Sequence, residues 1–266
     1  MKLSWTIEKG DRRVVADLIA STSGHRVVQE RLSRNVDGAA PTFNRDEVWR
    51  VLIGCLLTTQ QKSGPNAPIS RVLHATKFPL TLKACKRRDV CGFVESTLTK
   101  AGGIRRAPTI AAEVARNLAT LDDGGWKQIE AEFTKLLQLR LRSPVANDGV
   151  RERSSAEIVD RLLVGFGPKQ SRNFWQWLGL TRYEIPIDSR IISWLNETFG
   201  LEVSGAGLSS DAYYNFVGDG IRELCAACNV IPCVFDAAVF SAQEPVVDLS
   251  TSGARARARS RSPTRA

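Results

Sequence analysis

Residues 154–200, SSAEIVDRLLVGFGPKQSRNFWQWLGLTRYEIPIDSRIISWLNETFG, contain the signals that decide the fold. Ser154 and Glu157 have the spacing of a capping box, which predicts a helix that starts here and ends near Leu163. The next four residues, 164–167, place two glycines between apolar runs and predict a tight turn. Glycine there lets the backbone adopt positive φ and approach a ligand closely.

A second helix is predicted directly after this turn. Pro168 suits the first position of a helix, where its missing amide is not needed, and Gly179 suits the stop. The apolar side chains between them predict a buried face: Phe174, Trp175, Trp177 and Leu178. Asp188 follows the run Ile185-Pro186-Ile187 and is predicted to open a third helix, where an aspartate is an ordinary cap.

The turn also predicts an anion site. The hairpin leaves the amides of Gly165 and Gly167 unpaired beside the positive end of the second helix, a setting that favours a phosphate. Lys169 lies in the first turn of that helix, where the macrodipole disfavours a cation. A lysine in this position is a candidate nucleophile, and the alternative is a surface or phosphate-contacting lysine.

The segment Leu163–Lys169, LVGFGPK, resembles the helix-hairpin-helix of the DNA glycosylase superfamily that includes endonuclease III and the 8-oxoguanine glycosylases. Its pattern in that superfamily is L-x-G-φ-G-x-K, with φ apolar and matched here by Phe166. The stretch 185–191, IPIDSRI, is similar to the apolar-Asp stretch of the superfamily. The resemblance implies that Lys169 is the Schiff-base lysine of the bifunctional members and that Asp188 is their catalytic aspartate.

The stretch 42–61, TFNRDEVWRVLIGCLLTTQQ, predicts a helix capped by Asn44, with Glu47 at its third position and a broad apolar face behind. It resembles the first core-domain helix of the superfamily. There, an amide side chain after the apolar run fills the gap left by an extruded base. The resemblance implies this role for Gln60, with Gln61 as its neighbour, and the alternative is a polar helix end.

The stretch 234–242, VFDAAVFSA, resembles the last helix of 8-oxoguanine glycosylases, where a Gln contacts the base edge and a Phe four residues later stacks on it. Asp236 stands in place of the Gln, which changes the base edges that are tolerated, and Phe240 matches the Phe. The resemblance also implies that Asn173 and Arg190 line this site. Ordinary core packing is the alternative for Phe240.

Cys225, Cys228 and Cys233 invite a metal interpretation, because endonuclease III relatives hold an iron–sulfur cluster with four cysteines in this region. Gly218 occupies the place of the first of the four. Three ligands do not complete such a cluster, so no metal is expected. The six cysteines are instead expected to be reduced packing residues.

The composition fits a partner that is a nucleic acid. The net charge is +9, and the five arginines of residues 253–266 leave +4 on the rest of the chain. No apolar run reaches the roughly 18 residues of a membrane span, and the start of the sequence has no signal-peptide pattern. The expected location is the cytoplasm, with the nucleoid, or the nucleus, with no membrane association.

These patterns together predict an all-α, two-lobed glycosylase fold with a central DNA-binding cleft. Residues 1–45 and 154–242 are expected to form one lobe, residues 46–167 a core lobe ending in the helix-hairpin-helix, and residues 243–266 a disordered basic tail.

The predicted function is that of a base-excision DNA glycosylase with AP-lyase activity, acting as a monomer on double-stranded DNA that contains a damaged, oxidised base. Two alternatives stay open: a monofunctional glycosylase that uses Asp188 and water, and a non-catalytic DNA-binding module. No cofactor is expected to be required; the hairpin carbonyls could hold a monovalent cation, Na⁺ or K⁺.

Overall fold

The structure is a computed structural model that describes residues 4–59, 67–145 and 147–243. Gln60, Gln61 and the predicted tail from residue 244 onward lie outside these residues. The described chain is helical throughout, without a strand, which confirms the predicted all-α class. No single described helix is long and apolar enough to cross a membrane, although α12 (Asp211–Ala227) and α13 (Pro232–Ala242) would pass that test as a pair bent by 96°.

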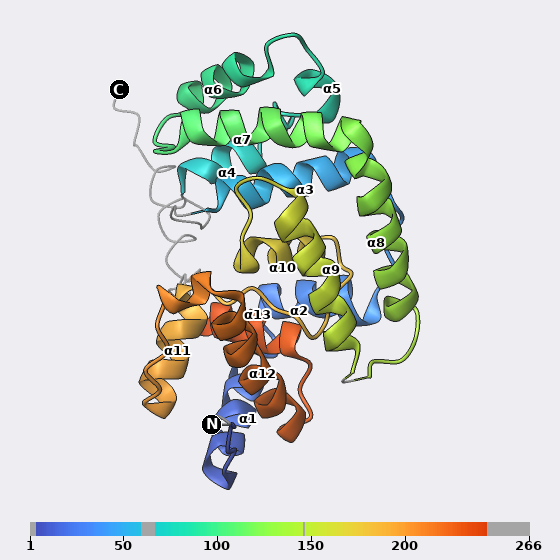
Figure 1. The fold of residues 1–266 in the computed structure, drawn as a ribbon. Coiled ribbons are helices and arrows are strands. Elements are labelled where there is room, and N and C mark those ends of the chain that lie inside the picture. The colour runs from blue at the N-terminus through green and yellow to red at the C-terminus, as the bar shows by residue number, and fades with distance from the viewer. Residues whose placement is uncertain (1–3, 60–66, 146, 244–266) are drawn as a thin grey trace, which may run out of the picture.

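Two hydrophobic cores divide the molecule into two lobes (Figure 1). The first lobe is drawn above the second, and α10 lies between them. The helices of the first lobe are α3 (Arg45–Leu57), α4 (Pro68–Leu73), α5 (Leu82–Cys85), α6 (Val90–Ala101), α7 (Ala107–Thr120), the π-helical turn η2 (Leu121–Gly125), α8 (Trp126–Arg140), α9 (Asp148–Leu162) and α10 (Pro168–Trp177).

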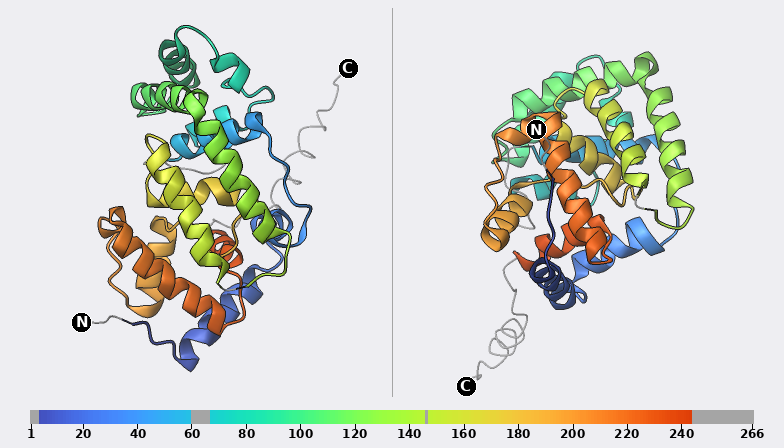
Figure 2. Two further views of the ribbon diagram at one scale, coloured as in Figure 1. Left: turned by 45° about the vertical axis from the view of Figure 1, so that its right-hand side comes forward. Right: turned by 60° about the horizontal axis from the view of Figure 1, so that its bottom comes forward.

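The second lobe joins the beginning of the chain to its last helices. The left view of Figure 2 shows these helices together at one end of the molecule. They are α1 (Lys9–Thr22), α2 (Arg26–Arg31) with the π-helical turn η1 (Leu32–Asp37), α11 (Ser189–Phe199), the 3-10 turn η3 (Gly207–Ser209), α12 (Asp211–Ala227) and α13 (Pro232–Ala242). Because α13 packs on α1, α2 and α11, it is apolar on most of its faces and largely buried.

The division between the lobes differs from the predicted one. The first core includes Ala156 and Val159 of α9, Trp175 of α10 and Leu180, whereas the second core resumes at Ile185. The prediction that residues 154–242 join the first 45 residues in one lobe is therefore corrected. Both helices of the hairpin unit belong to the first lobe, because their apolar faces pack against α3 and α8.

Local signals set most of the helix ends near the site. Asn44 caps α3 as predicted and accepts hydrogen bonds from the amides of Asp46 and Glu47. Pro168 is the first residue of α10, and Gly179, at φ +78°, follows its end. At φ +65°, Gly200 ends α11 in the left-handed conformation that glycine adopts without strain.

The start of α9 is an exception. The helix begins at Asp148, so Ser154 lies inside it and donates a hydrogen bond to the carbonyl of Val150, 3.2 Å away. The predicted capping box at Ser154 is therefore wrong. Asp148 stabilises the earlier start because its carboxylate is buried, pairs with Arg142 and lies 3.6 Å from Arg182.

Candidate active site

The hairpin between α9 and α10 is held against α7 by one buried side chain. Asn117 accepts a hydrogen bond from the amide of Val164 at 2.7 Å and donates one to its carbonyl at 2.9 Å. Gly165 has φ +82°, and a Cβ atom added there would lie 2.5 Å from Cδ of Glu113. The backbone conformation and the space available both require glycine at this position.

The outer side of the hairpin presents backbone donors. Within the residues that the structure describes, the amides of Gly165, Phe166 and Gly167 donate to no protein acceptor. Gly167 is the N-cap of α10 and has no side chain to satisfy the first amides of the helix. Unpaired amides at the positive end of a helix form the physical setting for an anion.

Lys169 is the second residue of α10 and is partly exposed. Burial raises the pKa of Cys55 on α3 to about 12, and the nearby charge of Lys169 opposes that rise. Lys169 therefore lies close to α3 as well as at the start of its own helix.

Asp188 is the N-cap of α11, as predicted. Its Oδ1 accepts hydrogen bonds from the amides of Arg190, at 2.9 Å, and Ile191, at 3.2 Å. Its Oδ2 lies 3.2 Å from Nη1 of Arg190, and 28% of the side chain remains exposed. The carboxylate thus caps a helix while it stays accessible from outside.

The carboxylate of Asp236 on α13 interacts electrostatically with both Lys169 and Asp188. Burial raises its pKa, Asp188 raises it further, and the positive charges of Arg31 and Lys169 lower it. Coulombic interactions of this kind weaken with distance, so the amine and the carboxylate both lie near Asp236. Lys169 of the first lobe and Asp188 of the second therefore both influence the carboxylate of Asp236.

Asp236 and Phe240, the two side chains predicted to contact a base, lie one turn apart on α13. The carboxylate of Asp236 is 13% exposed and pairs with Nη1 of Arg31 at 2.6 Å. Phe240, one turn later, is partly exposed, and the guanidinium carbon of Arg190 lies 4.3 Å from its ring centroid. This arrangement is a cation–π contact. Arg190 therefore links Asp188 to the aromatic ring.

Asn173, one turn after Lys169, lies between two helices of the first lobe. It is 5% exposed, and its amide donates to Sγ of Cys55 at 3.8 Å and to Oε1 of Gln170 at 3.3 Å. Its side chain is therefore held within the interface between α10 and α3.

A buried ion cluster connects the elements that carry Lys169 and Asp188. Arg172 donates to the carbonyl of Pro168 at 2.9 Å and to Glu184 at 2.7 Å. Glu184, in the loop before α11, is 4% exposed and also accepts from Arg153 and Arg222. Arg172 thus joins the first turn of α10 to the loop that leads to Asp188.

Glu152 of α9 binds the backbone of the same loop. This carboxylate is fully buried and accepts the amides of Arg182, Tyr183 and Glu184 at 2.7–2.9 Å. Burial raises its pKa to about 7 against the opposing effect of these three hydrogen bonds.

Four polar residues around the site were not predicted from the sequence: the partly exposed Arg31 and the buried Asn117, Glu152 and Gln170. In Asn117 and Glu152 the available signal was a polar residue on the apolar face of an amphipathic helix. The roles of Arg31 and Gln170 depend on partners 205 and 111 positions away and left no local signal.

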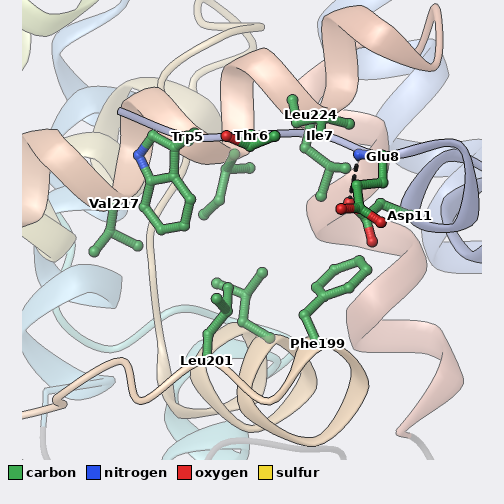
Figure 3. Close-up of a pocket in the computed structure, with 12 residues that line it drawn as sticks. Trp5, Thr6, Ile7, Glu8, Asp11, Phe199, Leu201, Val217 and Leu224 are labelled. Carbon is green, nitrogen blue, oxygen red and sulfur yellow. Dashed lines mark hydrogen bonds between the residues drawn. The ribbon is translucent and has the colours of Figure 1, made fainter. Parts of the chain in front are cut away.

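Two further features lie apart from this site. Across the described residues, no group of three or more His, Cys, Asp or Glu side chains could hold a metal ion. A cavity of about 230 Å³ opens in the second lobe between the extended segment 4–8, α11 and α12, where Trp5 and Phe199 line it (Figure 3). None of the predicted site residues lines this cavity.

No family model and no curated protein matches the sequence. Among solved structures, the 8-oxoguanine DNA glycosylase of Methanocaldococcus jannaschii is similar, with a TM-score of 0.60 and 16% sequence identity. The match covers 87% of this chain and 92% of that one. The chain has the fold of this helical glycosylase.

Proposed function

We propose that the chain is a base-excision DNA glycosylase with AP-lyase activity. The proposal rests on Lys169 in the first turn of α10 and Asp188 at the N-cap of α11, which come from different lobes and both act electrostatically on the partly buried Asp236. An amine beside a partly exposed carboxylate suits attack on a sugar carbon that becomes positively charged. The likeness in fold to an 8-oxoguanine DNA glycosylase supports the same assignment.

The chemistry follows from the roles of the two groups. Asp188 takes a proton from the Lys169 ammonium, and the free amine attacks C1′ of the flipped nucleotide. The C1′–N bond breaks, the base leaves with the bonding electrons, and the carboxylate stabilises the positive charge that develops on the sugar. The C1′–O4′ bond of the sugar ring then opens, O4′ takes up the proton that the attacking nitrogen gives up, and a protonated Schiff base forms at C1′. Loss of a 2′ proton and breakage of the C3′–O bond by β-elimination then nick the strand.

The backbone donors of the hairpin would hold the strand. The amides of Gly165, Phe166 and Gly167 suit a phosphate group and carry no sequence information. Arg190, partly exposed beside Asp188, would add a second positive contact to the backbone. We propose that double-stranded DNA binds in a cleft between the two lobes, and that Gln60, outside the described residues, fills the space of the extruded base.

Asp236 and Phe240 would contact the flipped base. A carboxylate accepts hydrogen bonds and donates none, so Asp236 favours a base edge that presents N–H donors. The ring of Phe240 offers a face on which a base can stack. We propose an oxidised purine as the substrate class, in keeping with the substrate that the name of the similar enzyme gives.

Borohydride trapping on duplex DNA with an abasic site tests the proposal. Wild type is expected to form a covalent adduct that Lys169→Gln loses, and Asp188→Asn is expected to lose release of an oxidised base. Base release without any adduct would replace the lyase by a monofunctional glycosylase. DNA binding with neither reaction would leave a non-catalytic DNA-binding module.

A further inference from the structure

The end of α3 lies directly against the first turn of α10, next to Lys169. The hydroxyl groups of Thr58 and Thr59 both donate to carbonyls of their own helix, at 3.0–3.1 Å. Their oxygen atoms are therefore available as acceptors. The side chain of Gln170 meets them, with Nε2 at 2.9 Å from Oγ1 of Thr59 and 3.4 Å from Oγ1 of Thr58.

Gln170 has one orientation in this interface. Its Oε1 accepts a hydrogen bond from Nδ2 of Asn173 at 3.3 Å, so its Nε2 is the end that faces α3. Gln170 is 5% exposed and follows Lys169 in the sequence. A glutamine with both ends of its amide engaged in a buried interface specifies one geometry, which an apolar side chain of the same size would not do.

Thr59 is also held from its other side. Nη1 of Arg106 lies 3.5 Å from the carbonyl of Thr59, and Nη2 of Arg106 pairs with Glu113 at 3.0 Å. Glu113 in turn lies against Gly165 of the hairpin. A chain of polar contacts therefore runs from Glu113, which lies beside the hairpin, through Arg106 and Thr59 to Gln170.

We propose that Gln170 is a positioning residue that holds the end of α3 in register with Lys169, and this proposal rests on the proposed glycosylase function. The hydrogen bonds of Gln170 to Thr58 and Thr59 fix the position of the first turn of α10, which carries Lys169, relative to the end of α3. Loss of these bonds would let the end of α3 and the start of α10 shift relative to each other, and misplacement of about 1 Å can lower a rate about 100-fold.

Gln170→Met tests this inference, because methionine matches glutamine in length and lacks its hydrogen bonds. The variant is expected to lower the single-turnover rate of borohydride-trapped adduct formation by about 10- to 100-fold. DNA affinity by fluorescence anisotropy and the melting temperature are expected to stay close to wild type. Gln176→Met is the matched control on the same helix, because its buried side-chain amide has no hydrogen-bond partner among the described residues.

A double-mutant cycle separates positioning from general loss of packing. Thr59→Val removes one acceptor, and the double variant Gln170→Met/Thr59→Val should be no slower than Gln170→Met alone. The inference would be overturned if the rate losses of Gln170→Met and Thr59→Val multiplied in the double variant. A rate of Gln170→Met within twofold of wild type would overturn it as well. If Gln170→Met does not fold, Thr59→Val alone must still lower the rate at unchanged DNA affinity. Failure of wild type to form an adduct would instead count against the proposed function.

Discussion

The two halves of the candidate site are held in place by different forces. On the first-lobe side, neutral amides do the positioning: Asn117 fixes the hairpin and Gln170 fixes the start of α10. On the second-lobe side, charged pairs do it, between Arg31 and Asp236 and between Arg190 and Asp188. Neutral hydrogen bonds respond little to pH or salt, whereas ion pairs respond to both. The amide contacts of Asn117 and Gln170 should therefore respond less to pH and salt than the ion pairs of the carboxylate side, whereas the Arg172–Glu184 pair, which reaches Pro168, should respond to both.

The largest expected effect comes from removing the amine while both lobes stay intact. Lys169→Gln is expected to lower adduct formation on abasic DNA about 1,000-fold or more, because no other group supplies the nucleophile. Lys127→Gln is the matched control, since Lys127 is exposed and is also the second residue of its helix, α8. If Lys169→Gln formed the trapped adduct at the wild-type rate, Lys169 would not be the nucleophile, and the first lobe would supply no group to the covalent step.

A change on the carboxylate side should alter selectivity before it abolishes activity. If Asp236 accepts hydrogen bonds from the base, wild type should excise 8-oxoguanine faster than 8-oxohypoxanthine, which lacks the 2-amino donor, by about tenfold to 100-fold. Asp236→Asn should narrow this ratio. Single-turnover excision of the two bases measures it.

Asp219→Asn is the control for the loss of a carboxylate in the same lobe. Asp219 lies on α12 and pairs with Arg153 of α9 and with Arg222 of α12, outside the proposed base site. An equal ratio in wild type and Asp236→Asn would exclude Asp236 from base selection and would leave the lyase step untouched.

The hairpin offers a smaller effect that depends on backbone geometry alone. Gly165→Ala should lower the free energy of unfolding by about 1–3 kcal/mol, because φ is positive there and Glu113 and Leu56 occupy the space of a Cβ. Gly167→Ala is the matched control for stability, since its φ of −161° suits any residue and nothing lies within 4 Å of an added Cβ. Chemical denaturation of both variants measures the difference, and equal losses would contradict it.

Local chemistry explains what the sequence could predict. Asn44, Pro168 and Asp188 act on amides or dihedral angles within three residues, so their roles are visible in the sequence. The capping box at Ser154 failed because a buried carboxylate at Asp148 starts the helix earlier. A buried ion pair can therefore move the start of a helix away from the position that a local capping pattern predicts.

The partners of the site residues could not be predicted, because they come from distant parts of the chain. Asp236 meets Arg31 across 205 positions, and Gln170 meets Thr59 across 111. The division into lobes failed for the same reason: α9 and α10 carry apolar faces, and only the packing shows which core receives them. The resemblance to glycosylases indicated Lys169 and Asp188, and the structure brings both near Asp236.

The smallest expected effect sharpens the contrast between neutral and charged supports. Glu152 is a charged support beneath the loop to Asp188, with a pKa raised to about 7 in the folded chain from an ordinary value of 4.5. The folded state therefore binds more protons than the unfolded state between these two values, so the free energy of unfolding falls as pH rises through this window. The contribution amounts to about 1–3 kcal/mol.

Glu152→Gln should flatten this part of the pH profile, because the titrating group is gone, while Lys169 and its hydrogen-bonded surroundings are unchanged. Glu130→Gln, at an exposed position on α8, is the control for the loss of one glutamate. Thermal or urea unfolding from pH 4.5 to 8 measures the slope in each variant. A slope in Glu152→Gln equal to that of wild type would mean that another buried acid carries the pH dependence, with Asp236 and its partner Arg31 the pair to change next.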